Sequence, residues 1–206
     1  MPLINIHNLN KDRAWGLWHI QEEWPTLEQS YALNSEEADY LASISHPSKK
    51  QEWLASRLTV GMVCEHLRLP YAGTLKTPDK RPYLCEQNGL VSISHSHAYA
   101  AAIIDAQKPV GIDLERIDTK ILGIRKKFLF DEEFSEDIRH MTQYWCIKET
   151  GYKLAGQKGI SFKDDIIVDP IESGLESGIT KIHLSTTSYT IQFFEYDNYI
   201  VAFNID

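Results

Sequence analysis

The strongest constraint on the fold is a change of pattern that occurs twice along the chain. A helical pattern that begins near residue 45 gives way after residue 70 to short apolar segments bounded by turn residues, and a second helical region over 131–155 is again followed by such segments. Apolar residues three and four positions apart are typical of helices, whereas short runs of branched and aromatic residues between turns are typical of strands. Both halves therefore run helix, then strands, which predicts an α+β fold.

The helices expected in the first half have clear start signals. Asn34 is followed three residues later by Glu37, and this pattern of a capping box predicts a helix start. A longer helix is expected to begin near Ser45 and Pro47 and to end before residues 70–73. Its apolar stripe consists of Leu54, Leu58, Met62, Val63 and Leu67.

The expected strands are short and occur on both sides of the second helical region. They cover residues 13–20, 91–95, 98–104, 110–117, 160–169, 180–184, 188–196 and 199–204. Together with one long helix in each half, they predict two similar α+β subdomains in a pseudo-twofold arrangement. We expect the first to comprise residues 1–107 and the second residues 108–206.

Composition narrows the functional classes. With 206 residues, of which 43% are apolar, the chain can bury a core, and its net charge of −8 argues against nonspecific binding of nucleic acid. The three cysteines are widely separated and lack metal-site spacing, which is typical of reduced thiols in a cytosol. The longest apolar run, 98–104, is too short to cross a bilayer, and no signal peptide is recognisable. We therefore expect a cytoplasmic protein without a membrane partner.

Two carboxylates lie close together in the stretch GIDLE. Asp113 and Glu115 are two residues apart on an expected strand, so their side chains project from the same face. Two like charges side by side repel each other unless a cation or a solvated surface relieves them. A solvent-exposed edge strand and a metal site are both consistent with this motif alone.

A third carboxylate comes from the stretch WCIKETGYK. Glu149 and Lys153 are four residues apart and share one face of the expected helix. An ordinary surface ion pair has the same spacing. If the helix packs beside the strand of Asp113 and Glu115, however, three carboxylates converge, and such hard oxygen ligands suit Mg²⁺.

Other motifs indicate the chemical class of the substrate. His95 and His97 in SISHSH would share a face on a strand and could donate to a phosphate, although ordinary hydrogen-bonded histidines are more common. The chain has no glycine-rich phosphate loop, no GxSxG elbow and no HExxH helix. What remains is a carboxylate metal site, a lysine one helical turn away and scattered cations. This combination indicates that the substrate is a phosphate ester.

Taken in order, KRPYL, SISHS, GIDLE and WCIKETGYK resemble the 4′-phosphopantetheinyl transferases of the surfactin-synthetase type, over residues 49–155. The resemblance implies a two-lobed monomer with Mg²⁺, or Mn²⁺, as cofactor. It also implies a holo-acyl-carrier-protein synthase activity, in which 4′-phosphopantetheine moves from coenzyme A to a serine of an apo acyl or peptidyl carrier protein. The second product is 3′,5′-ADP.

The resemblance also assigns roles to individual residues. The metal ligands it implies are Asp113, Glu115 and Glu149, and the catalytic pair is Glu149 and Lys153. The contacts to coenzyme A that it implies are Arg57, Arg81 and His95, with Lys49 and Lys50 as looser matches. Cys146 and Thr150 stand where the family usually has other small residues, and neither replaces a ligand or a charged group.

Two further expectations concern partners and alternatives. The segment 116–127 carries five basic residues mixed with apolar ones, Ile121, Leu122, Ile124 and the following Phe128, so we expect it to dock an acidic carrier protein. A Mg²⁺-dependent hydrolase of coenzyme A or of another nucleotide diphosphate would use the same carboxylates. A non-catalytic module that binds coenzyme A or a carrier protein would need only the cations.

Overall fold

The chain, in a computed structural model that describes residues 3–79, 81–86, 89–157 and 159–206, consists of two compact units. Unit 1 is Met1–Val110 and unit 2 is Gly111–Asp206. The sequence placed the division between residues 107 and 108. Helices and antiparallel sheets occur in both units, as expected of an α+β chain.

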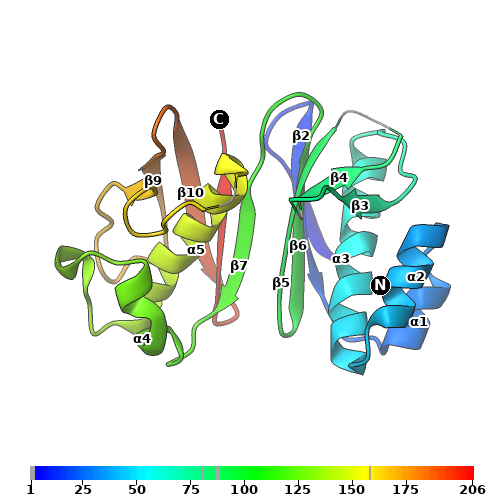
Figure 1. Cartoon of the computed structure of the whole chain (residues 1–206), viewed down its shortest axis with the longest axis horizontal. Coiled ribbons are helices and arrows are strands. Elements are labelled where there is room, and N and C mark those ends of the chain that lie inside the picture. Colours follow the sequence, from blue (N-terminus) through cyan, green and yellow to red (C-terminus); the bar gives the residue numbers. More distant parts are fainter. Residues whose placement is uncertain (1–2, 80, 87–88, 158) are drawn as a thin grey trace. The chain divides into compact units, whose positions relative to one another are not determined.

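Unit 1 is a four-stranded sheet with a long helix packed against it (Figure 1). The antiparallel sheet has the order β1-β2-β6-β5, and β3 and β4 form a separate two-stranded sheet. The elements of unit 1 are β1 (Leu3–Asn8), β2 (Arg13–His19), α1 (Trp24–Gln29), α2 (Ser35–Ser43), α3 (Pro47–His66), β3 (Thr74–Lys76), β4 (Pro82–Leu84), β5 (Leu90–Ser96) and β6 (Tyr99–Asp105).

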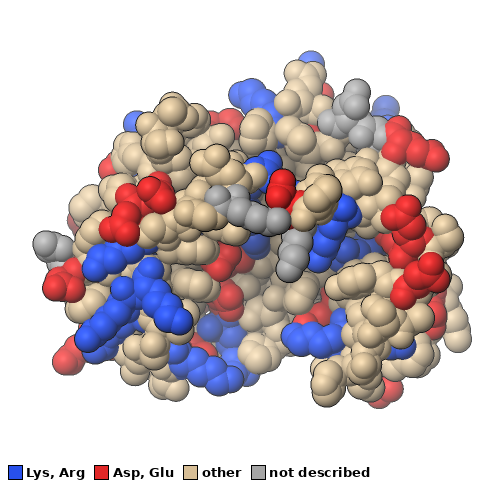
Figure 2. Space-filling model, in the orientation of Figure 1, with Lys and Arg blue, Asp and Glu red and all other residues tan. Residues whose placement is uncertain are grey.

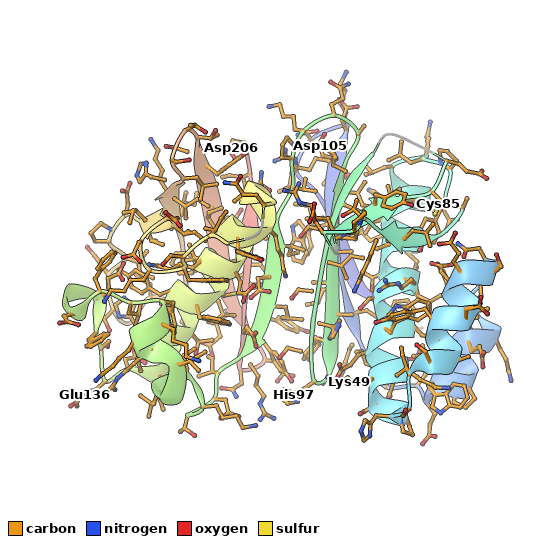
Figure 3. All side chains as sticks on the ribbon, viewed as in Figure 1. Lys49, Cys85, His97, Asp105, Glu136 and Asp206 are labelled. Atoms are coloured by element: carbon orange, nitrogen blue, oxygen red, sulfur yellow. The ribbon has the colours of Figure 1, made fainter. Side chains whose placement is uncertain are left out.

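The helix α3 lies close to the sheet because a glycine faces it. A Cβ atom on Gly16 of β2 would come within 2.9 Å of Val63 Cγ2 on α3, so a larger residue would force the two elements apart. A buried ion pair, Arg13 Nε to Asp105 Oδ2 at 2.6 Å, joins β2 to the end of β6, where Figure 3 labels Asp105. The backbone amides of Gln107 and Lys108 also donate to this carboxylate, so the turn after β6 is tied to it.

Unit 2 is a five-stranded antiparallel sheet covered by one long helix (Figure 1). The strand order is β7-β11-β10-β9-β8. The elements of unit 2 are β7 (Ile112–Arg116), α4 (Ile121–Ile124), η1 (Arg125–Lys127), η2 (Asp131–Glu133), α5 (Ile138–Ala155), β8 (Ile167–Val168), β9 (Ser177–His183), β10 (Ser188–Tyr196) and β11 (Tyr199–Asn204).

The two units share one topological framework. In unit 1, β2 is followed by α3 and then by the hairpin β5–β6, and the strand order is β2-β6-β5. In unit 2, β7 is followed by α5 and later by the hairpin β10–β11, in the order β7-β11-β10. In both cases the strand before the long helix pairs with the last strand of the hairpin.

Most expected elements are present. Asn34 caps α2, with its side chain accepting from the amide of Glu37 and the Glu37 side chain accepting from Asn34, so the predicted capping box is confirmed. The strands expected at 13–20, 91–95, 98–104, 110–117, 180–184, 188–196 and 199–204 correspond to β2, β5, β6, β7, β9, β10 and β11. Within the described residues, no helix combines the length and the apolar character that crossing a bilayer requires.

Three expectations are wrong. The strand expected over 160–169 is reduced to β8, because the segment before it forms turns. The helix expected from 131 begins only at Ile138, after the short 3₁₀ helix η2. His97 does not share a strand face with His95, since it lies in the tight turn between β5 and β6 with φ of 48° (Figure 3).

Candidate active site

The acidic residues of unit 2 lie on two elements that approach each other unusually closely. A Cβ atom on Gly111, directly before β7, would lie 2.7 Å from the carbonyl oxygen of Thr150 and 2.8 Å from Leu154 Cγ, both on α5. Only glycine permits this approach without displacing backbone. The glycine of the GIDLE stretch therefore sets the distance between the strand of Asp113 and the helix of Glu149.

Lys153 spans this short distance. Its Nζ donates to Asp113 Oδ1 at 2.7 Å and to the carbonyl oxygen of Ile112 at 2.8 Å. The Lys153 side chain is 24% exposed and the Asp113 side chain 5%, so the pair is largely shielded from water. The spacing of Glu149 and Lys153 thus does not indicate a simple surface pair, because Lys153 reaches across to the neighbouring strand.

Glu149 lies in the electrostatic field of the same group. Its pKa is raised from 4.5 to about 7, because burial, first of all, and the negative charges of Asp113 and Glu115 raise it more than the positive charge of Lys153 lowers it. Its carboxyl group is therefore near its titration midpoint at neutral pH. A carboxylate in this range is suited to accept a proton from a hydroxyl group.

Glu115 is positioned by a tryptophan on α5. Trp145 Nε1 donates to Glu115 Oε1 at 3.2 Å. The indole ring stacks on Phe162 at 5.3 Å between centroids and meets the edge of Phe128 at 5.0 Å. Tyr152 stacks on the same Phe162 at 5.0 Å. This row of aromatic rings restricts the orientation of Trp145 and hence of the carboxylate that it binds.

The three carboxylates match a hard divalent cation in chemistry. Asp113, Glu115 and Glu149 supply only oxygen donors, and a cation among them would relieve the repulsion that raises the Glu149 pKa. Among the described residues, however, no three histidine, cysteine, aspartate or glutamate side chains are spaced to hold one ion, and Lys153 occupies Asp113. The metal set expected from the sequence therefore stays a prediction.

Two residues of α5 that differ from the expected motif, Cys146 and Thr150, lie in the interface between this helix and the sheet. Cys146 is fully buried and its thiol donates to the carbonyl oxygen of Ile200, while burial raises its pKa well above the usual value. The Thr150 hydroxyl lies 3.0 Å from the carbonyl oxygen of Ala202. Both side chains bind the helix to β11, and the negative charges of Asp113 and Glu115 add to the rise in the pKa of Cys146, which stays a neutral thiol.

Unit 1 holds the cations predicted to bind coenzyme A. Arg57 on α3 is only 5% exposed, and its guanidinium lies 4.4 Å from the centroid of the Trp53 ring. Burial lowers its pKa, and Arg57 Nε has no hydrogen-bond partner among the residues that the structure describes. A buried guanidinium of this kind is energetically costly unless an anion binds it, and a phosphate group would do so.

The other predicted cations of unit 1 differ in their surroundings. Lys50 lies over the Trp24 ring at 4.6 Å. Arg81 is exposed just before β4, and its amide donates to the Thr77 hydroxyl. Lys80, which belongs to the basic stretch around Arg81, lies outside the described residues.

His95 and Lys49 are brought together by a residue that the sequence analysis did not single out. His95 Nδ1 lies 3.2 Å from Glu52 Oε2, and Lys49 Nζ lies 2.7 Å from the same oxygen. Lys49 and Glu52 are on the first turns of α3, and His95 is on β5. A glutamate three residues after a lysine on a helix is typical of a surface pair, so this spacing did not indicate the third partner, His95.

The basic segment after β7 is exposed. Figure 2 shows lysine and arginine side chains gathered over the part of unit 2 that contains α4. Lys120, Lys126 and Lys127 are exposed, and Leu122 between them is 38% exposed. Arg116 pairs with Asp118 at 2.6 Å, and the Arg125 guanidinium lies 5.6 Å from the Phe134 ring, so these two are held against the protein.

Comparison with known proteins gives one partial match. No family model matches the chain. A 4′-phosphopantetheinyl transferase of Bacillus subtilis is 35% identical to it over 82 residues, and this match covers 36% of each protein. The chain thus matches little more than a third of that relative's length. The match supports a relation to the phosphopantetheinyl transferase superfamily.

Proposed function

We propose that the protein transfers 4′-phosphopantetheine from coenzyme A to a serine of an apo acyl or peptidyl carrier protein. The observation that carries this proposal is the position of Lys153 against Asp113, beside a Glu149 whose pKa is raised to about 7. The partial similarity to a phosphopantetheinyl transferase supports the same reaction. In it, the serine oxygen bonds to the β-phosphorus, and the bond from that phosphorus to the oxygen of 3′,5′-ADP breaks.

The residues of unit 2 would carry the reacting charges. Glu149 would accept the proton of the serine hydroxyl, for which a pKa near the working pH is favourable. Lys153 would stabilise the negative charge that develops on the leaving phosphate, or donate a proton to it. The protein itself forms no covalent intermediate in this scheme.

Asp113, Glu115 and Glu149 would hold a divalent cation, Mg²⁺ or Mn²⁺. When bound, the cation neutralises charge on the pyrophosphate and lowers the barrier to attack on phosphorus. Lys153 holds Oδ1 of Asp113, so a cation would bind this carboxylate through Oδ2 or would compete with Lys153 for it. Trp145 keeps Glu115 in place meanwhile.

The cations of unit 1 would bind the phosphates of coenzyme A that do not react. Arg57 has a buried guanidinium whose Nε such an anion would satisfy, and His95 and Lys49 both lie against Glu52. Arg81 and Lys50 would add to this charge from the surface. Because these groups do not touch the reacting atoms, their loss should weaken binding more than turnover.

An acidic carrier protein would dock on the basic segment of unit 2. Lys126 and Lys127 are exposed and lie over no aromatic ring of the described residues, so both can be reversed to glutamate without disturbing the packing of Arg125 on Phe134. The double reversal should raise the KM for the carrier protein and leave the KM for coenzyme A unchanged. An unchanged KM for the carrier protein would refute docking at this surface.

The reaction is tested by intact mass. The protein is mixed with Mg²⁺, coenzyme A and a panel of apo carrier proteins, and the carrier is expected to gain the mass of phosphopantetheine on its serine. The variant Glu149→Gln is the control for a contaminating activity. Release of free phosphopantetheine without modification of any carrier would instead indicate a hydrolase, and binding of coenzyme A without either product would indicate a non-catalytic module.

A further inference from the structure

Glu52 joins two cations that come from different elements of unit 1. It lies on the second turn of α3 and is 8% exposed. One of its oxygens, Oε2, is 2.7 Å from Lys49 Nζ and 3.2 Å from His95 Nδ1. Lys49 Nζ and His95 Nδ1 are therefore no further apart than these two distances together, and a single carboxylate fixes their spacing.

The carboxylate also determines which atoms remain available to a ligand. An ionised carboxylate only accepts hydrogen bonds, so Nδ1 of His95 carries a proton and Nε2 is the ring atom left for another partner. The His95 side chain is 39% exposed, which leaves the ring accessible. Lys49 has three N–H donors, of which Glu52 uses one, and its side chain is 61% exposed.

Glu52 stays charged over the whole physiological range. Burial raises its pKa, but the hydrogen bonds from His95 and Lys49 outweigh burial and lower the pKa to about 2. Its negative charge offsets the positive charge of Lys49. The glutamate therefore cannot strengthen the attraction of this cluster for an anion, and its contribution has to be geometric.

We propose that Glu52 is a positioning residue that presets Lys49 and His95 as a pair of donors for a phosphate monoester, the 3′-phosphate of coenzyme A. The proposal rests on the proposed function, which supplies coenzyme A as the ligand. A free lysine on a surface helix loses side-chain entropy when it binds, and a lysine already held by Glu52 loses less. The same argument applies to a histidine whose ring is already oriented.

Geometry and charge predict opposite effects of the same substitution. Glu52→Gln keeps the size of the side chain but removes the negative charge, so the local charge becomes more positive. If only charge matters, the variant binds phosphate monoesters more tightly than the wild type. If Glu52 acts by positioning, the variant binds them more weakly, because a neutral amide oxygen accepts from Lys49 and His95 less strongly than the carboxylate and holds the two donors less firmly.

The experiment compares the affinities for coenzyme A and 3′-dephospho-coenzyme A by isothermal titration calorimetry. We expect the wild type to prefer coenzyme A, and Glu52→Gln to reduce that preference about tenfold, the effect of one hydrogen bond to a charged group. The affinity for 3′-dephospho-coenzyme A should not change. Glu65→Gln is the matched control, because Glu65 is an exposed glutamate on the same helix, and its preference should equal that of the wild type.

The action of Glu52 through its two partners is tested in a second background. In the double variant Lys49→Ala, His95→Ala, the added change Glu52→Gln should have no further effect on the preference for coenzyme A. If Glu52→Gln does not fold, Glu52→Asp serves instead, because it keeps the charge and shortens the reach. It should lower the preference in the same direction.

The possible outcomes separate this proposal from the proposed function. A Glu52→Gln variant that keeps or increases the preference for coenzyme A, in an active wild-type background, overturns the role of Glu52 alone. Equal weakening of both ligands also overturns it, since a general loss of structure would have that effect. A wild type that neither modifies carrier proteins nor distinguishes the two ligands overturns the proposed function, and the role of Glu52 falls with it.

Discussion

The close approach of β7 and α5 can be tested by adding a single methyl group. In Gly111→Ala the new Cβ would lie 2.7 Å from the Thr150 carbonyl oxygen and 2.8 Å from Leu154 Cγ. Ordinary contact begins at 3.4 Å, so the strand and the helix have to separate by about 0.7 Å. Such overpacking typically destabilises a protein by about 1–3 kcal/mol.

The same movement should disturb the candidate active site. The bond from Lys153 to Asp113 is 2.7 Å long, and an added 0.7 Å or so would stretch it beyond the range of a charge-assisted hydrogen bond. A misplacement of about 1 Å in a catalytic group can lower turnover roughly 10²-fold. We therefore expect Gly111→Ala to lose both stability and turnover.

Urea unfolding followed by tryptophan fluorescence measures the loss of stability, and transfer to a carrier protein at saturating substrates measures turnover. Gly123→Ala is the control for stability, because a Cβ atom there meets nothing within 4 Å and the residue lies in a helix. Its stability should equal or slightly exceed that of the wild type. A Gly111→Ala variant with the stability and turnover of the wild type would refute the argument that this contact sets the geometry of the site.

Three other predictions concern individual charged groups. Glu149→Gln should lower kcat about 10²-fold or more if Glu149 is the base, and near-normal kcat would exclude that role. Lys153→Met should lower kcat but tighten the binding of Mn²⁺ in the absence of coenzyme A, because Asp113 loses the ammonium group that now neutralises it. Titration calorimetry measures the Mn²⁺ affinity, and an unchanged value would contradict competition between Lys153 and a metal. Since the Glu52 pKa is lowered from 4.5 to about 2, its ion pairs stabilise the fold above about pH 4.5 and progressively less as the pH falls towards 2. The difference in unfolding free energy between the wild type and Glu52→Gln should therefore shrink from pH 7 to pH 3, and a constant difference would show that Glu52 does not act through its charge.

The elements predicted most accurately are those whose local sequence patterns agree with the way they pack. The capping box of Asn34 and Glu37 and the apolar stripe of α3 both use local patterns, and both helices are present. The prediction of a strand over 160–169 was wrong for a reason that is also local. Ser161 and Asp164 bond to each other, and the amide of Ser161 donates to Asp165, so side chains compete with strand pairing there.

The candidate site was predictable in its acidic members but not in its supporting contacts. Asp113, Glu115 and Glu149 could be proposed from spacing and family resemblance. The support from Trp145 to Glu115 joins residues on different elements, as does the link from Glu52 to His95. Such pairings depend on which elements pack together, and local patterns of spacing and charge do not show that.

The framework shared by β2–α3–β5–β6 and β7–α5–β10–β11 carries different charged side chains in the two units. If an ancestral segment was duplicated, each copy could keep its backbone while its long helix acquired its own ionic character. The long helix of unit 1 presents Arg57 and Lys49, and that of unit 2 presents Glu149. Folding and reactivity would then be inherited as separable traits, so that descendants could exchange the ligands they recognise while retaining one ancestral architecture.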